Sequence, residues 1–209
     1  MTRDCREQAV TSFYERMLEQ CEPAKARFKE RDLSIMPIDA GVSIGHVHLK
    51  VADLERALAF YCGVLGFDLT QRYGTEAAFV SAGGYHHHIG LNTWESRGSS
   101  PPAPGTTGLY HLAILYPTRA ALADALRRLL DASIPLHGAS DHGVSEALYL
   151  SDPDGNGIEL YWDRPREQWP RFANGEIEMF TRALDLGTLL DRAESSARIP
   201  HLQTGPRDL

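Results

Sequence analysis

In the first half of the chain, the spacing of apolar residues is typical of one strand, then one helix and then three more strands. VSIGHVHLKV (42–51) alternates as a half-buried strand does, and apolar residues from Leu54 to Leu65 then recur at helical spacing. Asp53 stands where the N-cap of that helix is expected. FDLTQRYG, EAAFVSAGG and YHHHIGLNTW are three strand candidates separated by glycines. The pattern therefore predicts a β-α-β-β-β unit.

The same order of elements starts again after residues 95–108, a segment rich in Ser, Pro and Gly that neither a helix nor a central strand tolerates. LYHLAILY (109–116) predicts a strand, Thr118 is the expected N-cap, and ALADALRRLL carries an apolar helical stripe. Strand candidates around residues 135–136, in EALYLSD and in GIELYWD complete the second unit. The chain therefore contains an internal duplication.

The duplication predicts an α+β fold, in which two paired βαβββ modules form an open-sided mixed β-barrel. The expected modules are residues 42–94 and 109–163, within a domain of residues 41–165. Helical extensions are expected at residues 1–40 and 166–209. The first has apolar residues at helical spacing, and the stretch EIEMFTRALDLGTLL predicts a helix in the second.

Composition narrows the class of protein. With 43% hydrophobic and 23% charged residues, the 209-residue chain is globular rather than disordered, collagen-like or coiled-coil. A net charge of −7 with no basic run gives no electrostatic support for nucleic-acid binding. No apolar stretch approaches a membrane span, and the start MTRDCREQAV lacks the apolar core of a signal peptide. We therefore expect a cytoplasmic protein that binds neither nucleic acid nor membrane.

Histidine is the residue type whose distribution points to chemistry, because eight of the nine histidines lie between His46 and His142. His46 and His111 open corresponding strands of the two modules, so a pseudo-twofold arrangement would bring them together. Glu159 lies in the apolar run GIELYW, where an unpaired carboxylate would be costly. Two imidazoles and one carboxylate form the facial triad of non-haem Fe(II) oxygenases. A lone strand histidine is more often a packed or surface residue, and spacing alone leaves that interpretation open.

The segments HVHLKVADLERALAFYCGVLGF, YHLAI and DPDGNGIELYWDRP resemble the vicinal oxygen chelate superfamily, which includes glyoxalases, bleomycin resistance proteins and extradiol dioxygenases. YHHHIGLNTW and SDHGVSEALYLSDPDGNGIE resemble its catechol 2,3-dioxygenase-like branch. The resemblance spans residues 42–172 and implies that His46, His111 and Glu159 are metal ligands. It implies Fe(II) as the metal, with Mn(II) or another divalent ion as the alternative.

The resemblance also implies three catalytic residues. Tyr149, ten residues before Glu159, would hydrogen-bond a substrate oxygen, although a half-buried strand tyrosine is the equally acceptable interpretation. His142 would face the substrate or bound oxygen. A histidine of the run 86–88 would exchange a proton with the substrate. On a strand His86 and His88 share one face, and which of them faces the pocket stays open, with His88 preferred.

An Fe(II)-dependent extradiol ring-cleaving dioxygenase is the implied function, with a small catechol-like aromatic and dioxygen as substrates. The resemblance also allows a homodimer. The alternatives are a glyoxalase-type metal-dependent lyase, isomerase or transferase, and a non-catalytic small-molecule-binding resistance protein. The glyoxalase I branch has a fourth ligand from the first module, but aligning HIGLNTW with GIELYW puts Gly90 opposite Glu159. A shift of the alignment by two residues would put His88 there instead.

Overall fold

The computed structural model describes residues 37–197. Residues 37–44 belong to one unit of the chain and residues 45–197 to another. In the first unit a turn forms at Asp39, whose side chain accepts a hydrogen bond from the Gly41 amide. The helix expected within residues 1–35 and the histidine at position 201 lie outside the described residues.

The first module contains six elements, which are β1 (Val47–Lys50), α2 (Leu54–Leu58), the π-helix η1 (Ala59–Val64), β2 (Asp68–Tyr73), β3 (Ala77–Ser81) and β4 (Ile89–Asn92). Asp53 caps α2 by accepting a hydrogen bond from the Arg56 amide, which confirms the expected N-cap. The sheet has the order β1-β4-β3-β2. β1 pairs with β4 in parallel, while the other neighbouring strands are antiparallel.

The second module repeats this arrangement with β5 (Leu112–Leu115), α3 (Arg119–Asp131), β6 (Gly138–Asp141), β7 (Ser145–Ser151) and β8 (Gly157–Asp163). After it come the 3₁₀ helix η2 (Arg166–Gln168), β9 (Arg182–Ala183) and α4 (Leu186–Ala197). The sheet order is β5-β8-β7-β6-β9, and β5 pairs with β8 in parallel. Thr118 caps α3 as expected. Between residues 37 and 197, no helix is long and apolar enough to cross a membrane. The duplicated α+β architecture is therefore confirmed.

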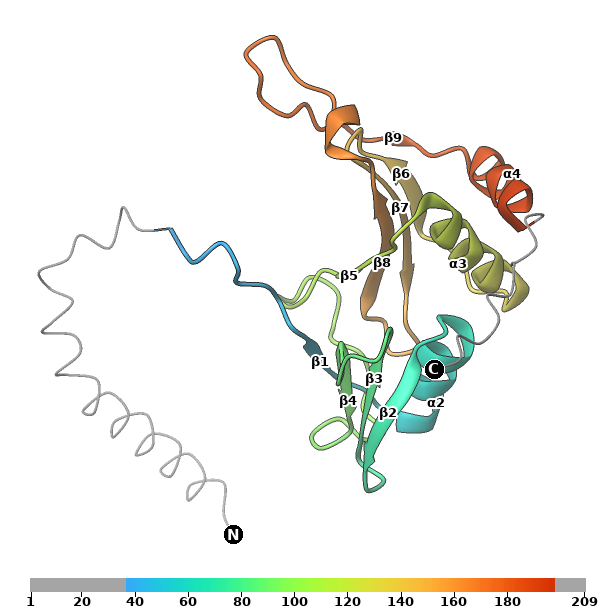
Figure 1. The fold of residues 1–209 in the computed structure, drawn as a ribbon. Coiled ribbons are helices and arrows are strands. Elements are labelled where there is room, and N and C mark those ends of the chain that lie inside the picture. Colours follow the sequence, from blue (N-terminus) through green and yellow to red (C-terminus); the bar gives the residue numbers. More distant parts are fainter. Residues whose placement is uncertain (1–36, 198–209) are drawn as a thin grey trace, which may run out of the picture. The chain divides into compact units, whose positions relative to one another are not determined.

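One hydrophobic core joins the two modules. Leu122, Leu126 and Leu129, the stripe of α3, are completely buried. Helix α3 lies along the sheet that contains β8, and α4 packs against α3 (Figure 1). The barrel is not closed, because β1 and β5 are each the outer strand of their own sheet and no described strand joins the two sheets.

A buried polar contact also links the modules. The side chain of Asp152, in the turn before β8, accepts hydrogen bonds from the hydroxyl of Tyr61 at 2.9 Å and from the amide of Asn156 at 2.9 Å. Two residues later, Asp154 accepts the amide of Ala52 at 2.9 Å and pairs with Arg56 at 2.6 Å. Both aspartates are buried. The turn before β8 thus also holds the first module.

Two sequence-based expectations are wrong about element limits. The strand placed at residues 135–136 begins at Gly138, because α3 ends in a tight turn in which Ser133 adopts a positive φ of 54°. The helix predicted from EIEMFTRALDLGTLL starts only at Leu186. Ahead of it, β9 pairs with the free edge of β6, so tertiary strand pairing overrides the helical spacing there.

We predict that Tyr61→Phe lowers the free energy of unfolding at neutral pH by about 1–3 kcal/mol, because the buried Asp152 carboxylate loses a donor. Burial, reinforced by Asp152, raises the pKa of Tyr61. The unfolded chain therefore releases this phenol proton first, so the wild-type advantage persists below about pH 10 and shrinks as the pH rises further.

Urea unfolding at a series of pH values measures this effect. Tyr73→Phe is the matched control, since Tyr73 is 66% exposed. Equal stability of Tyr61→Phe and Tyr73→Phe across the series would contradict the buried hydrogen bond.

Candidate active site

His111 and Glu159 meet on the second sheet. His111 directly precedes β5 and Glu159 lies in β8, the parallel neighbour of β5. The Nε2 atom of His111 is 3.0 Å from Oε2 of Glu159, with side chains 32% and 14% exposed. Gly157 allows this approach, because a Cβ at that position would lie 2.1 Å from the carbonyl oxygen of Tyr110 and 3.1 Å from Cβ of His111. The absence of a side chain at residue 157 therefore allows the two predicted ligands to lie in contact.

Tyr149 and His142 extend this pair. Tyr149 faces Glu159 across the β7–β8 ladder, and its hydroxyl donates to Oε1 of Glu159 at 3.0 Å. The Nε2 atom of His142 lies 2.8 Å from the same hydroxyl. Burial, followed by the contact with Glu159, raises the pKa of Tyr149, so the phenol keeps its proton at neutral pH. Four residues singled out by sequence thus form one connected network on the second module.

His46, the other predicted ligand, is not part of this network. It lies just before β1, and its ring centroid is 4.4 Å from that of His87. Among residues 37–197, no three His, Cys, Asp or Glu side chains are grouped so that they could hold one metal ion. The assignment of His46 as a ligand therefore stays a prediction.

The pair fits two positions around a metal ion. Two ligand atoms about 2.1 Å from an ion and at right angles to each other lie about 3 Å apart. The His111–Glu159 contact of 3.0 Å matches that separation. One imidazole nitrogen and one carboxylate oxygen suit a borderline divalent ion. The other ring nitrogen of His111, Nδ1, is buried with no hydrogen-bond partner in the described structure. Within residues 37–197, no third potential ligand is grouped with this pair.

The histidine run 86–88 differs from the expectation. It lies in the irregular connection before β4 rather than on a strand, so strand alternation does not govern it. Even so, Tyr85 packs against the rings of both His86 and His88, at centroid distances of 4.1 and 4.9 Å. The Nδ1 atom of His88 is 2.8 Å from the hydroxyl of Ser81. Its assignment as an acid–base residue stays a prediction.

Strand register settles which residue of the first module corresponds to Glu159. His48, two residues after His46, is paired with Gly90, and Ala113, two residues after His111, is paired with Glu159. Gly90 therefore occupies the equivalent position, and the alternative alignment through His88 is not the structural one. A Cβ at Gly90 would lie 2.9 Å from the ring of His48. The first module consequently has no closing-strand ligand.

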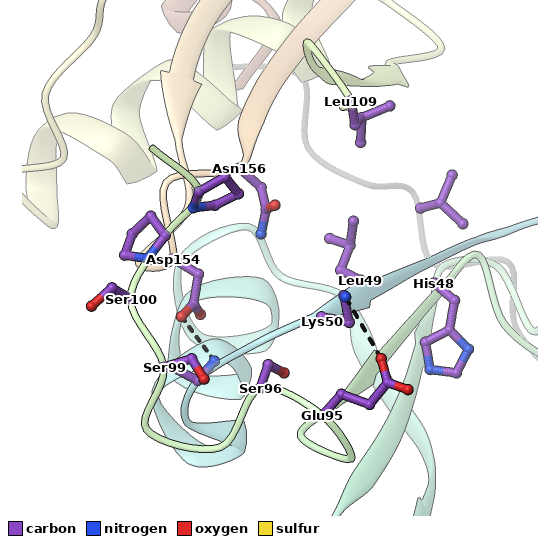
Figure 2. Close-up of a pocket in the computed structure, with 14 residues that line it drawn as sticks. His48, Leu49, Lys50, Glu95, Ser96, Ser99, Ser100, Leu109, Asp154 and Asn156 are labelled. Atoms are coloured by element: carbon purple, nitrogen blue, oxygen red, sulfur yellow. Dashed lines mark hydrogen bonds and ion pairs between the residues drawn. The ribbon is translucent and has the colours of Figure 1, made fainter. Parts of the chain in front are cut away.

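A pocket of about 640 Å³ lies elsewhere, along β1 (Figure 2). His48 and Lys50 line it from β1, the loop from Glu95 to Pro102 lines another side, and Asp154 and Asn156 border it. Lys50 pairs with Glu95 at 3.7 Å. The pocket includes none of the three predicted ligands.

Sequence reasoning missed two contributors to the network, Phe180 and Thr181. The carbonyl oxygen of Phe180 and the hydroxyl of Thr181 each lie 3.2 Å from Nδ1 of His142. Both residues fall in the stretch predicted as helix, and no periodic signal marks them as strand-like. Only the pairing of β9 with β6 brings them to His142.

Comparison with known proteins agrees with this architecture. Residues 43–160 match the model of the Glyoxalase/Bleomycin resistance protein/Dioxygenase superfamily. The chain belongs to this superfamily. It is 45% identical over 151 residues to a Bacillus subtilis catechol-2,3-dioxygenase, covering 72% of this chain and 52% of that protein. It is 32% identical over 120 residues to biphenyl-2,3-diol 1,2-dioxygenase 3 of Rhodococcus globerulus, covering 57% of this chain and 63% of that protein.

Among solved structures of the superfamily, a glyoxalase/dioxygenase from Nostoc punctiforme matches with a TM-score of 0.52 and 20% identity, over 63% of this chain and 97% of that one. This likeness concerns the fold alone. The chain spans about half the length of the Bacillus subtilis relative. Membership of the superfamily therefore shows the fold of the chain and leaves its reaction to the chemistry of the site.

We predict that Gly157→Ala lowers the free energy of unfolding by about 1–3 kcal/mol and weakens divalent-metal binding, because the added methyl group meets the Tyr110 carbonyl oxygen and pushes His111 away from Glu159. Gly138→Ala in β6 is the matched control, since a Cβ there meets no atom within 4 Å. Urea unfolding and calorimetric titration with Mn(II) measure both effects. Equal behaviour of the two variants would contradict the close approach at residue 157.

Proposed function

We propose that the chain is an extradiol ring-cleaving dioxygenase that acts on a catechol-like aromatic with dioxygen and uses Fe(II). The observation that carries this proposal is the network in which Tyr149 connects His142 to the His111–Glu159 pair. In this network a histidine–glutamate pair that suits a metal ion lies beside a phenol that keeps its proton and an imidazole. Identity of 45% to a catechol-2,3-dioxygenase supports the same reaction.

His111, Glu159 and His46 would hold the iron, with Mn(II) as the alternative ion for the same donor set. When bound, the metal supplies a common anchoring point for the catechol and dioxygen and a route for electrons between them. Three protein ligands leave positions open for both substrates.

Tyr149 and His142 would manage protons at the substrate. A raised pKa keeps the Tyr149 phenol protonated, so the proton that Glu159 accepts when no substrate is bound can turn to a substrate oxygen rather than repel it. His142, 2.8 Å from that hydroxyl, is the first candidate for exchanging a proton with the catechol. His88 is the second candidate for this acid–base role.

Oxygen uptake by iron-loaded, anaerobically prepared protein with a panel of catechols tests the reaction. We expect uptake with at least one catechol, together with the absorbance of a ring-opened semialdehyde. We expect Glu159→Gln to lower the rate of oxygen uptake at least about 10- to 100-fold. Removal of a residue that only supports a metal ligand already has an effect of that size. No uptake across the panel, with bound iron verified, would overturn the proposal.

A second copy of the chain completes the ligand set in this proposal. His46 and His111 each precede an outer strand, β1 and β5, whose free edge can pair with another chain. Apolar side chains at the β5 edge are exposed, including Tyr110 at 90% and Leu115 at 55%. In a twofold homodimer, β1 of one copy beside β5 of the other would cover these edges and create two equivalent sites.

Mixing two inactive variants tests this arrangement. We predict that His46→Ala and Glu159→Ala, each inactive alone, regain about a quarter of wild-type activity when unfolded and refolded together, because one site of each mixed dimer is intact. A mixture that stays inactive, although its dimers form, would place all three ligands in one chain.

A further inference from the structure

The C-terminal segment around β9 reaches the network, although the superfamily match ends at residue 160. In the β6–β9 ladder Asp141 pairs with Arg182, and the amide of Phe180 donates to the carbonyl oxygen of His142 at 3.3 Å. Gly143 makes room for the Phe180 ring, since a Cβ there would lie 2.8 Å from it. One ring nitrogen of His142 thus faces this segment, and the other faces Tyr149.

The Tyr149 hydroxyl has a single proton and two polar neighbours. Its bond to Oε1 of Glu159 uses that proton, because a carboxylate oxygen can only accept. The contact with His142 at 2.8 Å is then a hydrogen bond only if Nε2 of His142 carries hydrogen and donates to the tyrosine oxygen. The direction of one bond therefore fixes the direction of the next.

The same reasoning applies to the other side of the imidazole. A neutral ring with hydrogen on Nε2 has a bare lone pair on Nδ1, which requires a donor. The carbonyl oxygen of Phe180 cannot donate, whereas the hydroxyl of Thr181 can. If Phe180 were the only partner, hydrogen would move to Nδ1, Nε2 would accept from Tyr149, and the tyrosine proton would turn away from Glu159.

We infer that Thr181 is a positioning residue, which donates to Nδ1 of His142 and holds that ring in the Nε2–H tautomer. Donors then run in one direction, from Thr181 through His142 and Tyr149 to Glu159. Without the threonine hydroxyl the chain of hydrogen bonds reverses. The consequence for catalysis rests on the proposed function, but the tautomer does not.

Two-bond ¹H–¹⁵N correlation NMR of the full-length, metal-free chain reads the tautomer directly, at a pH above about 8 where an ordinary imidazole is neutral. We expect hydrogen on Nε2 of His142 in the wild type and in Thr181→Ser. Thr181→Val keeps the side-chain shape without the donor, and we expect hydrogen on Nδ1. The imidazole signals that are missing from the spectrum of His142→Asn are those of His142. The inference is overturned if the wild type has hydrogen on Nδ1, or if Thr181→Val keeps the wild-type tautomer.

Kinetics of the iron-loaded enzyme give a second measurement. We expect Thr181→Val to lower kcat by about 10-fold or more with little change in KM, and Thr181→Ser to restore it. Thr188→Val is the control, because Thr188 lies in the same segment but donates to Asp185. An unchanged kcat in Thr181→Val would remove Thr181 from the reaction. A wild type without turnover would count against the proposed function alone, since the NMR result decides on Thr181 independently.

Discussion

Two buried carboxylates in one turn hold the two modules together and set the position of Glu159. Asp152 and Asp154 are buried, and an unpaired carboxylate in such a place would be strongly destabilising. Their donors include Tyr61, Ala52 and Arg56 of the first module. Because β8 starts directly after this turn, the contact that joins the modules also fixes the strand that presents Glu159.

Duplication followed by divergence accounts for the asymmetry of the site. At one paired position the first module has a large residue on its opening strand and glycine on its closing strand, His48 and Gly90. The second module has the reverse, Ala113 and Glu159. The His48 ring occupies the space above Gly90, so a ligand side chain there would need a smaller partner on β1. Exchanging large and small residues thus confines the closing-strand carboxylate to one module.

Local signals in the sequence predicted the features that depend on interactions between residues close together in the chain. The caps at Asp53 and Thr118, the buried stripe of α3 and the order of the elements along both modules follow from capping and periodicity. Strand β9 in the C-terminal tail could not be predicted in this way, because its partner is the edge of β6, some forty residues earlier along the chain. The placement of His46 relative to His111 is likewise beyond periodicity, since it depends on how whole sheets are placed.

A site that binds a cation and also moves protons has conflicting needs, because ligand atoms must be free of protons while donors must keep theirs. In the proposed site the two needs are separated by strand. His111, just before β5, and Glu159, in β8, would present the ligand atoms, and Tyr149, from β7, keeps its proton through a raised pKa. Glu159 is where they meet, since Oε2 faces His111 and Oε1 accepts from Tyr149. Any change in the direction of the hydrogen bonds beyond Tyr149 therefore acts on Glu159 through a single carboxylate oxygen.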